Sequence, residues 1–264
     1  MAISSQVHTT AMRAASIHHG ESTPSSESAE RQLSRWGGRA GLAGVVSMFA
    51  TVGVVVGLGL PDASEVETLT DFSNIESGRI AEHFLYLGAL MFFALHVLVL
   101  HRLLRTVHAP AALFGTAVAE FGLVIMAASS LLHVSTKPLA DLYTAADTTA
   151  EDLRSIEYAW HAAQSVFDTM LATGVLLVPI GITLFGVAMW NAPAFGRRLA
   201  QVSLGLGILG TIGAAIEIFV PGSGFSAAAV LAIVVFHLVT GWRTLKLGYD
   251  RNIDLSDTKP ISVG

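Results

Sequence analysis

The sequence contains no cysteine, so it has no disulfide, no thiolate metal ligand and no cysteine nucleophile. Charge is also scarce. Charged residues make up 13% of the chain, whereas soluble domains carry about 25%. Hydrophobic residues make up 52%. This balance indicates a membrane protein rather than a soluble domain.

Several functional motifs are missing as well. No glycine-rich phosphate loop followed by Lys and Ser or Thr occurs, which argues against an ATP-driven pump on this chain alone. No HExxH metal motif and no basic patch for nucleic acid is present. The first 38 residues are polar and lack the apolar region of a secretory signal peptide, so residues 1–38 are predicted to be a disordered tail.

Long apolar runs dominate the rest of the chain. Each is long enough to cross about 30 Å of hydrocarbon as a helix. They cover residues 40–60, 80–104, 110–133, 162–190, 199–220 and 225–245. The sequence therefore predicts an all-α polytopic membrane protein, a bundle of six transmembrane helices over residues 39–248 with a short C-terminal tail at 249–264.

Basic residues are distributed unevenly between the segments that connect these runs. Twelve of the fifteen lie in the two tails and in the second and fourth loops. Only Arg79, Lys137 and Arg154 lie in the first and third loops. Cytoplasmic segments of membrane proteins carry the excess of Lys and Arg. Both termini and both tails are therefore predicted to be cytoplasmic, with the chain in a bacterial inner membrane and the lipid bilayer as its first partner.

One span opens with polar residues, in the stretch YAWHAAQSVFDTML. On a helix, His161, Gln164, Ser165 and Asp168 share one face. Asp168 is predicted about two turns inside the membrane, where a carboxylate cannot face acyl chains. We therefore expect this face to point into the bundle, as a polar seam or as a site.

Other ionisable side chains are predicted near mid-membrane. With Asp168, this deep layer contains His96, Glu120 and His237. One interpretation is a neutral, hydrogen-bonded set that locks the helices together. The other is a proton or ligand pathway. Facing histidines also bind haem, which would require His96 and His237 to be neighbours.

A second layer is predicted at the outer face. It contains His83, His133, His161, Glu217 and Glu157. Imidazole nitrogens with carboxylate oxygens suit zinc, iron or copper, so a divalent metal ion is a candidate cofactor here. The alternative is that these histidines are simply hydrated at the level of the lipid headgroups.

Local signals predict details of the helices. Thr148 and Glu151 have capping-box spacing and predict a helix that starts outside the membrane and runs into the fourth span. Pro179 is predicted to kink that helix. Ser203–Gly207 and Gly210–Ala214 have the four-residue spacing of small residues that lets helices approach closely.

Three stretches together resemble a known family. They are RAGLAGVVSMFATVGVVVG, LVLHRLLRTVHAPAALFGTAVAEFGLVIMAASSLL and LVPIGITLFGVAMWNAPAFGRRLAQVSLGLGILG. They are similar to an uncharacterised bacterial family of six-helix integral membrane proteins that carries a domain-of-unknown-function label. The likeness covers roughly residues 39–248. It implies the fold and the membrane location but supplies no activity or catalytic residue.

Two function classes follow from these observations. The first is a multi-pass membrane protein that binds or transports a small molecule or an ion, or that is a subunit of a membrane complex. Such a protein could also form a homo-oligomer. The second is a metal-dependent membrane hydrolase or oxidoreductase with its site at the outer face. The sequence does not identify a substrate.

Overall fold

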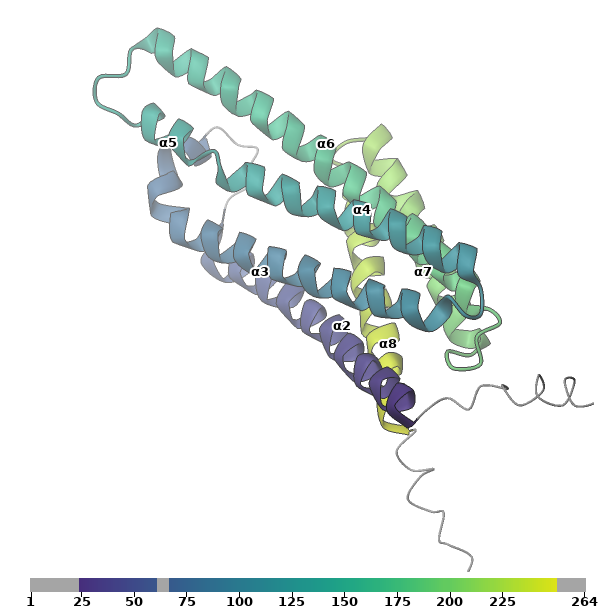
Figure 1. Cartoon of the computed structure of the whole chain (residues 1–264). Coiled ribbons are helices and arrows are strands. Elements are labelled where there is room, and N and C mark those ends of the chain that lie inside the picture. Colours follow the sequence, from purple (N-terminus) through teal and green to yellow (C-terminus); the bar gives the residue numbers. More distant parts are fainter. Residues whose placement is uncertain (1–23, 61–66, 251–264) are drawn as a thin grey trace, which may run out of the picture.

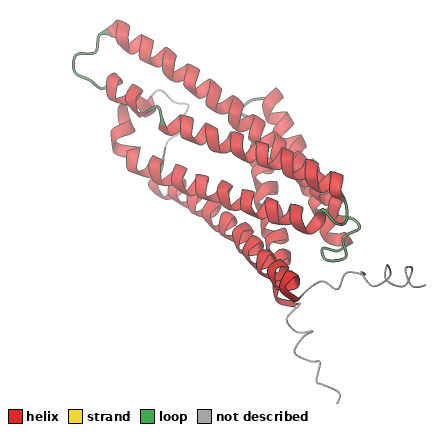
Figure 2. Cartoon of the chain, in the orientation of Figure 1, coloured by secondary structure: helices red, strands yellow, loops and turns green. Residues whose placement is uncertain are grey.

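The computed structural model describes residues 24–60 and 67–250. Its helices are α2 (Pro24–Leu58), α3 (Glu67–Leu104), α4 (Ala109–Val134), α5 (Lys137–Tyr143), α6 (Ala150–Met189), α7 (Arg197–Phe219) and α8 (Ser226–Asp250). No strand occurs within these described ranges (Figure 2). The all-α prediction is confirmed.

Six of the helices are long and apolar enough to cross a membrane. The candidate spans are Glu27–Leu58, Asn74–Leu104, Ala109–Leu131, Ala150–Met189, Arg197–Phe219 and Ser226–Asp250. They coincide with the six predicted spans. The chain is therefore a multi-pass membrane protein, and the cytoplasmic placement of its termini stays a prediction.

The six long helices form a closed ring in the order of the sequence. Each packs against the next, and α8 closes the ring by packing against α2 (Figure 1). Helix α8 also contacts α6 and α3 across the ring. Because consecutive spans run in opposite directions, the start of α2 and the end of α8 lie together at one end of the ring.

Glycine permits the closest of these contacts. A Cβ atom on Gly181 of α6 would lie 2.7 Å from the Cβ of Ala119 on α4. One on Gly210 of α7 would lie 2.9 Å from the ring of Pro179. Ser203, Gly207, Gly210 and Ala214 of α7 are all buried. The small residues of the fifth span therefore serve helix packing, as predicted.

The first turns of helix α6 extend past the end of α7, and we call them the outer extension after the predicted topology. Its N-cap is Thr149, whose side chain accepts a hydrogen bond from the Asp152 backbone while Asp152 accepts one from the Thr149 backbone. The predicted box at Thr148 and Glu151 is thus one residue off. The reason is that the Thr148 hydroxyl instead donates to the Leu142 carbonyl, at 2.7 Å.

A small apolar cluster supports this outer extension. Trp160 and Ile156 of α6 pack with Leu69 and Phe72 of α3 and with Ala140 of α5. An ion pair of 3.0 Å between Lys137 and Glu76 ties α5 to α3. The hydrogen bond to Glu76 raises the pKa of Lys137.

The domain boundaries differ slightly from those expected. Helix α2 begins at Pro24, so its first turns precede the Arg39 boundary between tail and membrane domain. Within these turns Arg35 Nε donates to the Gly248 carbonyl of α8 at 3.0 Å, which ties them to α8. The tail predictions for residues 1–23 and 251–264 lie outside the described residues.

Candidate functional site

Two buried imidazoles join α3 to α8. The Nδ1 atoms of His96 and His237 are 2.9 Å apart, and both side chains are fully buried. The Phe93 ring stacks on His237 with centroids 3.9 Å apart, and the Phe236 ring meets it edge-on. The His96–His237 pair is therefore a hydrogen-bonded polar contact inside an aromatic shell.

The neighbouring sequence explains why the two rings fit. On α3, His96 shares a face with the buried residues Phe93 and Leu100 at helical spacing. On α2, Gly41 lies against the His96 ring, because a Cβ there would be 2.8 Å from Nδ1. A glycine at this position leaves room for an imidazole between α2 and α8.

The two rings lie at the same depth along their helices, inside the apolar spans. His96 precedes Arg102 by six residues, and His237 precedes Arg243 by six residues. At a rise of about 1.5 Å per residue, both rings lie roughly 9 Å inward from those arginines. Two helices thus give the same depth independently.

The hydrogen bond constrains the protonation of the two rings. When both are neutral, one ring donates from Nδ1–H and keeps a bare Nε2, while the other accepts at Nδ1 and carries its proton on Nε2. Both Nε2 atoms are buried without a hydrogen-bond partner among the described residues. A buried polar atom without a partner costs about 1–3 kcal/mol. Such atoms in a membrane interior favour a functional role over packing alone.

The haem interpretation of this pair does not fit. Metal–imidazole bonds are about 2.0–2.1 Å long, so an ion between two imidazoles holds their nitrogens about 4 Å apart. The His96 and His237 nitrogens are 2.9 Å apart and bonded to each other. The two histidines are neighbours, but they are not placed to clamp an iron.

Glu120 lies deeper along α4 and is separate from the pair. It is half-buried, and its Oε1 atom is buried without a hydrogen-bond partner among the described residues. It follows Ala109 by eleven residues, which corresponds to roughly 16 Å along the helix. No hydrogen bond joins it to His96 or His237 within the described chain.

The polar face of α6 is oriented differently from the prediction. Gln164 is buried, but His161, Ser165 and Asp168 are exposed, so the prediction that this face points into the bundle is wrong for those three. The polar face lies five helical turns before the face of α6 that packs on α7. Because 18 residues make five turns, the three exposed residues align with Pro179, Thr183 and Gly186.

The neighbour of that face ends too early to cover it. Gly210 of α7 packs on Pro179, and α7 ends nine residues later at Phe219, level with residue 170 of the antiparallel α6. Asp168 also lies about level with residue 132, two residues before α4 ends at Val134, because Gly174 packs on Met126 of the antiparallel α4. The carboxylate thus lies near the ends of both neighbouring helices, where neither covers it.

The outer layer does not gather into a metal site. His83 Nδ1 bonds to Ser130 at 2.8 Å, and Glu157 accepts from the Tyr143 hydroxyl at 3.0 Å. Glu217 accepts from the backbone of Gly222 and Ser226 at the start of α8. His161 is exposed.

The His133 side chain lies outside the described residues. Among the side chains that are described, no group of three His, Cys, Asp or Glu could hold a metal ion. The predicted convergence on one ion therefore has no support here, because the carboxylates and His83 have other local partners.

Sequence reasoning missed two polar contacts of α3. Arg79 is buried and forms an ion pair of 2.9 Å with Glu82. One turn further along, His83 joins α3 to α4 through Ser130. The spacing of three residues between Arg79 and Glu82 was a usable signal for the ion pair, whereas no sequence signal pairs His83 with Ser130.

Comparison with known proteins gives a family and no activity. The model of a domain of unknown function, DUF4386, matches residues 41–242. That match covers most of the chain, so the protein belongs to this family and the predicted resemblance is confirmed. No curated protein matches the chain, and no solved structure does.

Proposed function

We propose that this member of the DUF4386 family is a transport-related membrane module whose His96–His237 pair binds and releases a proton. The observation that carries the proposal is the 2.9 Å contact between two fully buried imidazoles. Ionisable side chains inside membranes mark ion pathways and proton relays. Imidazole is also the side chain that most readily changes charge near neutral pH.

The pair can accept one proton without breaking its hydrogen bond. The proton adds to the bare Nε2 of the donor ring, which becomes an imidazolium and still donates Nδ1–H to its neutral neighbour. The charged pair then has two Nε2–H groups. Neither has an acceptor among the described residues in the present conformation.

Protonation therefore favours a different conformation. A charge in the membrane interior costs at least about 2.5 kcal/mol on insertion scales. No carboxylate among the described residues hydrogen-bonds to either ring. The pair meets Gly41 from α2, Phe93 from α3 and Phe236 from α8. The proton-loaded state is stabilised when α3 and α8 separate enough for water to reach Nε2.

The charged groups nearest along these helices are cations. They are Arg39 on α2, Arg102 on α3 and Arg243 on α8. On α6, the side that reaches this region is apolar, with Phe185 stacked on Phe236. These cations oppose a positive charge on the pair, which also favours the neutral pair in the closed ring.

Proton flux into liposomes tests the proposal. Purified protein is reconstituted with an internal pH-sensitive dye, and a potassium gradient with valinomycin imposes a membrane potential. We expect the wild-type protein to accelerate proton entry and the His96→Gln and His237→Gln variants to lose most of that acceleration. His161→Gln is the matched control, since His161 is exposed, and it should keep the flux.

Two results would contradict the proposal. One is wild-type flux no faster than that of empty liposomes, and the other is equal flux in the His96→Gln and wild-type proteins. If a variant does not reconstitute, nitrogen-15-labelled histidine in the wild-type protein replaces it. One proton shared between two rings shifts both Nδ1 resonances together on acidification, whereas independent titration argues against a shared proton.

Cellular placement belongs to the same proposal. We place the protein in a bacterial inner membrane with both termini in the cytoplasm. Support comes from nine basic residues of the described chain at the end where α2 begins: Arg31, Arg35, Arg39, Arg102, Arg105, Arg197, Arg198, Arg243 and Lys246. The alternative of a metal-dependent hydrolase or oxidoreductase at the outer face has less support, because its candidate ligands are dispersed.

A further inference from the structure

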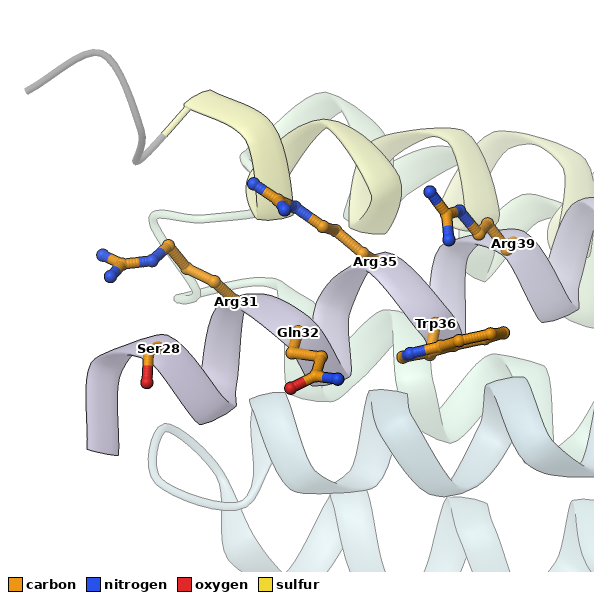
Figure 3. Close-up of a pocket in the computed structure, with 6 residues that line it drawn as sticks. All are labelled: Ser28, Arg31, Gln32, Arg35, Trp36 and Arg39. Carbon is orange, nitrogen blue, oxygen red and sulfur yellow. The ribbon is translucent and has the colours of Figure 1, made fainter. Parts of the chain in front are cut away.

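A row of arginines lies where α2 enters the membrane. Arg31, Arg35 and Arg39 are four residues apart and share one side of the helix. With Trp36 and Gln32 they line a shallow groove (Figure 3). Trp36 is 61% exposed. An exposed tryptophan beside cations is typical of the interface between membrane and water.

Two of these guanidinium groups are already held in place. Arg35 donates through Nε to the Gly248 carbonyl at 3.0 Å and lies over the Tyr249 ring. Arg39 donates to the Tyr249 hydroxyl at 3.3 Å and lies over the Trp36 ring. A guanidinium has five N–H donors, so each arginine keeps donors for an anion. Fixed donors lose little entropy when they bind.

The acid nearest to Arg31 is a weak competitor for such an anion. The Glu27 carboxylate is 3.8 Å from Arg31, and its side chain is half exposed. The Arg31 side chain is 16% exposed, but the long distance and the hydrated carboxylate keep the contribution of this pair to about 0–1 kcal/mol. A phosphate group can therefore replace this carboxylate as the partner of Arg31.

The surface below the arginines is suited to an acyl chain. Val46 follows Arg39 by seven residues, so it lies on the same side of α2 about 10 Å further into the membrane. It is 69% exposed, and Phe49 beside it is also exposed. A ligand with a phosphate at one end and a hydrocarbon chain at the other matches both parts of this helix face.

We propose that Arg31, Arg35 and Arg39 bind the headgroup phosphate of an anionic phospholipid whose acyl chain lies along Val46 and Phe49. Basic segments at the end of a transmembrane helix bind anionic lipids at about 1 kcal/mol per Lys or Arg. That free energy corresponds to about a fivefold weakening for each arginine removed. This site is separate from the histidine pair and does not depend on proton transport.

Native mass spectrometry of the full chain in detergent tests the site. The probes are phosphatidylglycerol, phosphatidylcholine and inorganic phosphate. We expect phosphatidylglycerol to stay bound to the wild-type protein and to lose on the order of a hundredfold in affinity in the triple variant Arg31→Gln, Arg35→Gln and Arg39→Gln. The matched control Arg102→Gln, Arg105→Gln and Arg198→Gln removes the same charge elsewhere at that end and should keep the lipid.

Three outcomes would overturn the proposal. Equal loss in both triple variants would indicate a response to net charge alone. Displacement of the lipid by inorganic phosphate at similar concentration would indicate a free-phosphate site. Equal retention of phosphatidylcholine would indicate no headgroup selectivity. If the α2 triple variant does not fold, the single variant Arg39→Gln still has to weaken phosphatidylglycerol binding about fivefold relative to Arg102→Gln.

Discussion

One face of α6 is buried against α7 in one half of the helix and exposed in the other half. In the membrane it presents Pro179, Thr183 and Gly186 to α7 and is in close contact with it. Five turns earlier the same face presents His161 and Asp168 to the outside. The difference arises from α7, which ends at Phe219. Helical periodicity therefore fixes which residues share a face, and the length of the neighbouring helix decides whether that face is buried.

The outer half of α6 is held by its other side. Trp160 is fully buried against Leu69, Phe72 and Ala140. Trp160→Ala should remove about 3–5 kcal/mol of stability, because it leaves a large cavity in a small cluster. Limited proteolysis would detect the loss as new cleavage in the segment between α5 and α6.

The control for this variant is Tyr158→Ala, since Tyr158 is on the same turn and 76% exposed. It should leave the cleavage pattern unchanged. Equal cleavage in both variants would mean that Trp160 does not hold the outer segment.

The buried half of the face should resist enlargement. Gly186→Val places a Cβ 2.8 Å from the Leu204 side chain and close to the α7 backbone. Overpacking of this kind costs about 1–3 kcal/mol. The midpoint of thermal unfolding in detergent should fall, and Asp168→Val, five turns earlier, should lower it much less.

Removing the N-cap of α6 should cost less stability than either of the two substitutions above. Thr149→Ala removes the N-cap and should cost about 1 kcal/mol of helix stability. Faster hydrogen exchange of the Asp152 amide would report it. Thr149→Ser keeps the hydroxyl and should restore slow exchange, whereas equal exchange in both variants would contradict the capping role.

The exposed half of the face should be the least sensitive. Asp168→Asn is expected to change stability by no more than about 0.5 kcal/mol, because the side chain is exposed. Labelling gives a sharper result, since the native chain has no cysteine. A water-soluble maleimide should label Asp168→Cys rapidly and Gly186→Cys hardly at all. Protection of Asp168→Cys would mean that the face is covered after all.

The sequence was sufficient to predict the six spans, but hydropathy alone did not predict where the helices begin. Six apolar runs are evident because hydrocarbon requires about 20 apolar residues from each helix. Helix α2 begins at Pro24, well before its apolar run, and α6 begins at Ala150, where capping-box spacing rather than hydropathy predicted its start to within about one residue. The added turns are stabilised by contacts with α8, α3 and α5, and hydropathy does not record such contacts.

The candidate site was only partly predictable. His96 and His237 were identified as deep residues from their positions in two spans, but 141 positions separate them. Their contact depends on the ring order, which brings α8 against both α2 and α3. Asp168 was misplaced because the fourth span was assumed to start near residue 162, whereas α7 ends level with residue 170 and leaves the preceding part of α6 uncovered.

The closure of the ring by α8 has a consequence for synthesis. Five spans leave the ribosome before α8 does, since α8 begins only at Ser226. Until then His96 has no imidazole to bond with. The side of α2 that packs on Gly241 of α8 through Gly38 is also uncovered. The insertion of α8 therefore completes the ring and the His96–His237 contact in one step, and a nascent chain stopped before α8 leaves the His96 ring without that partner.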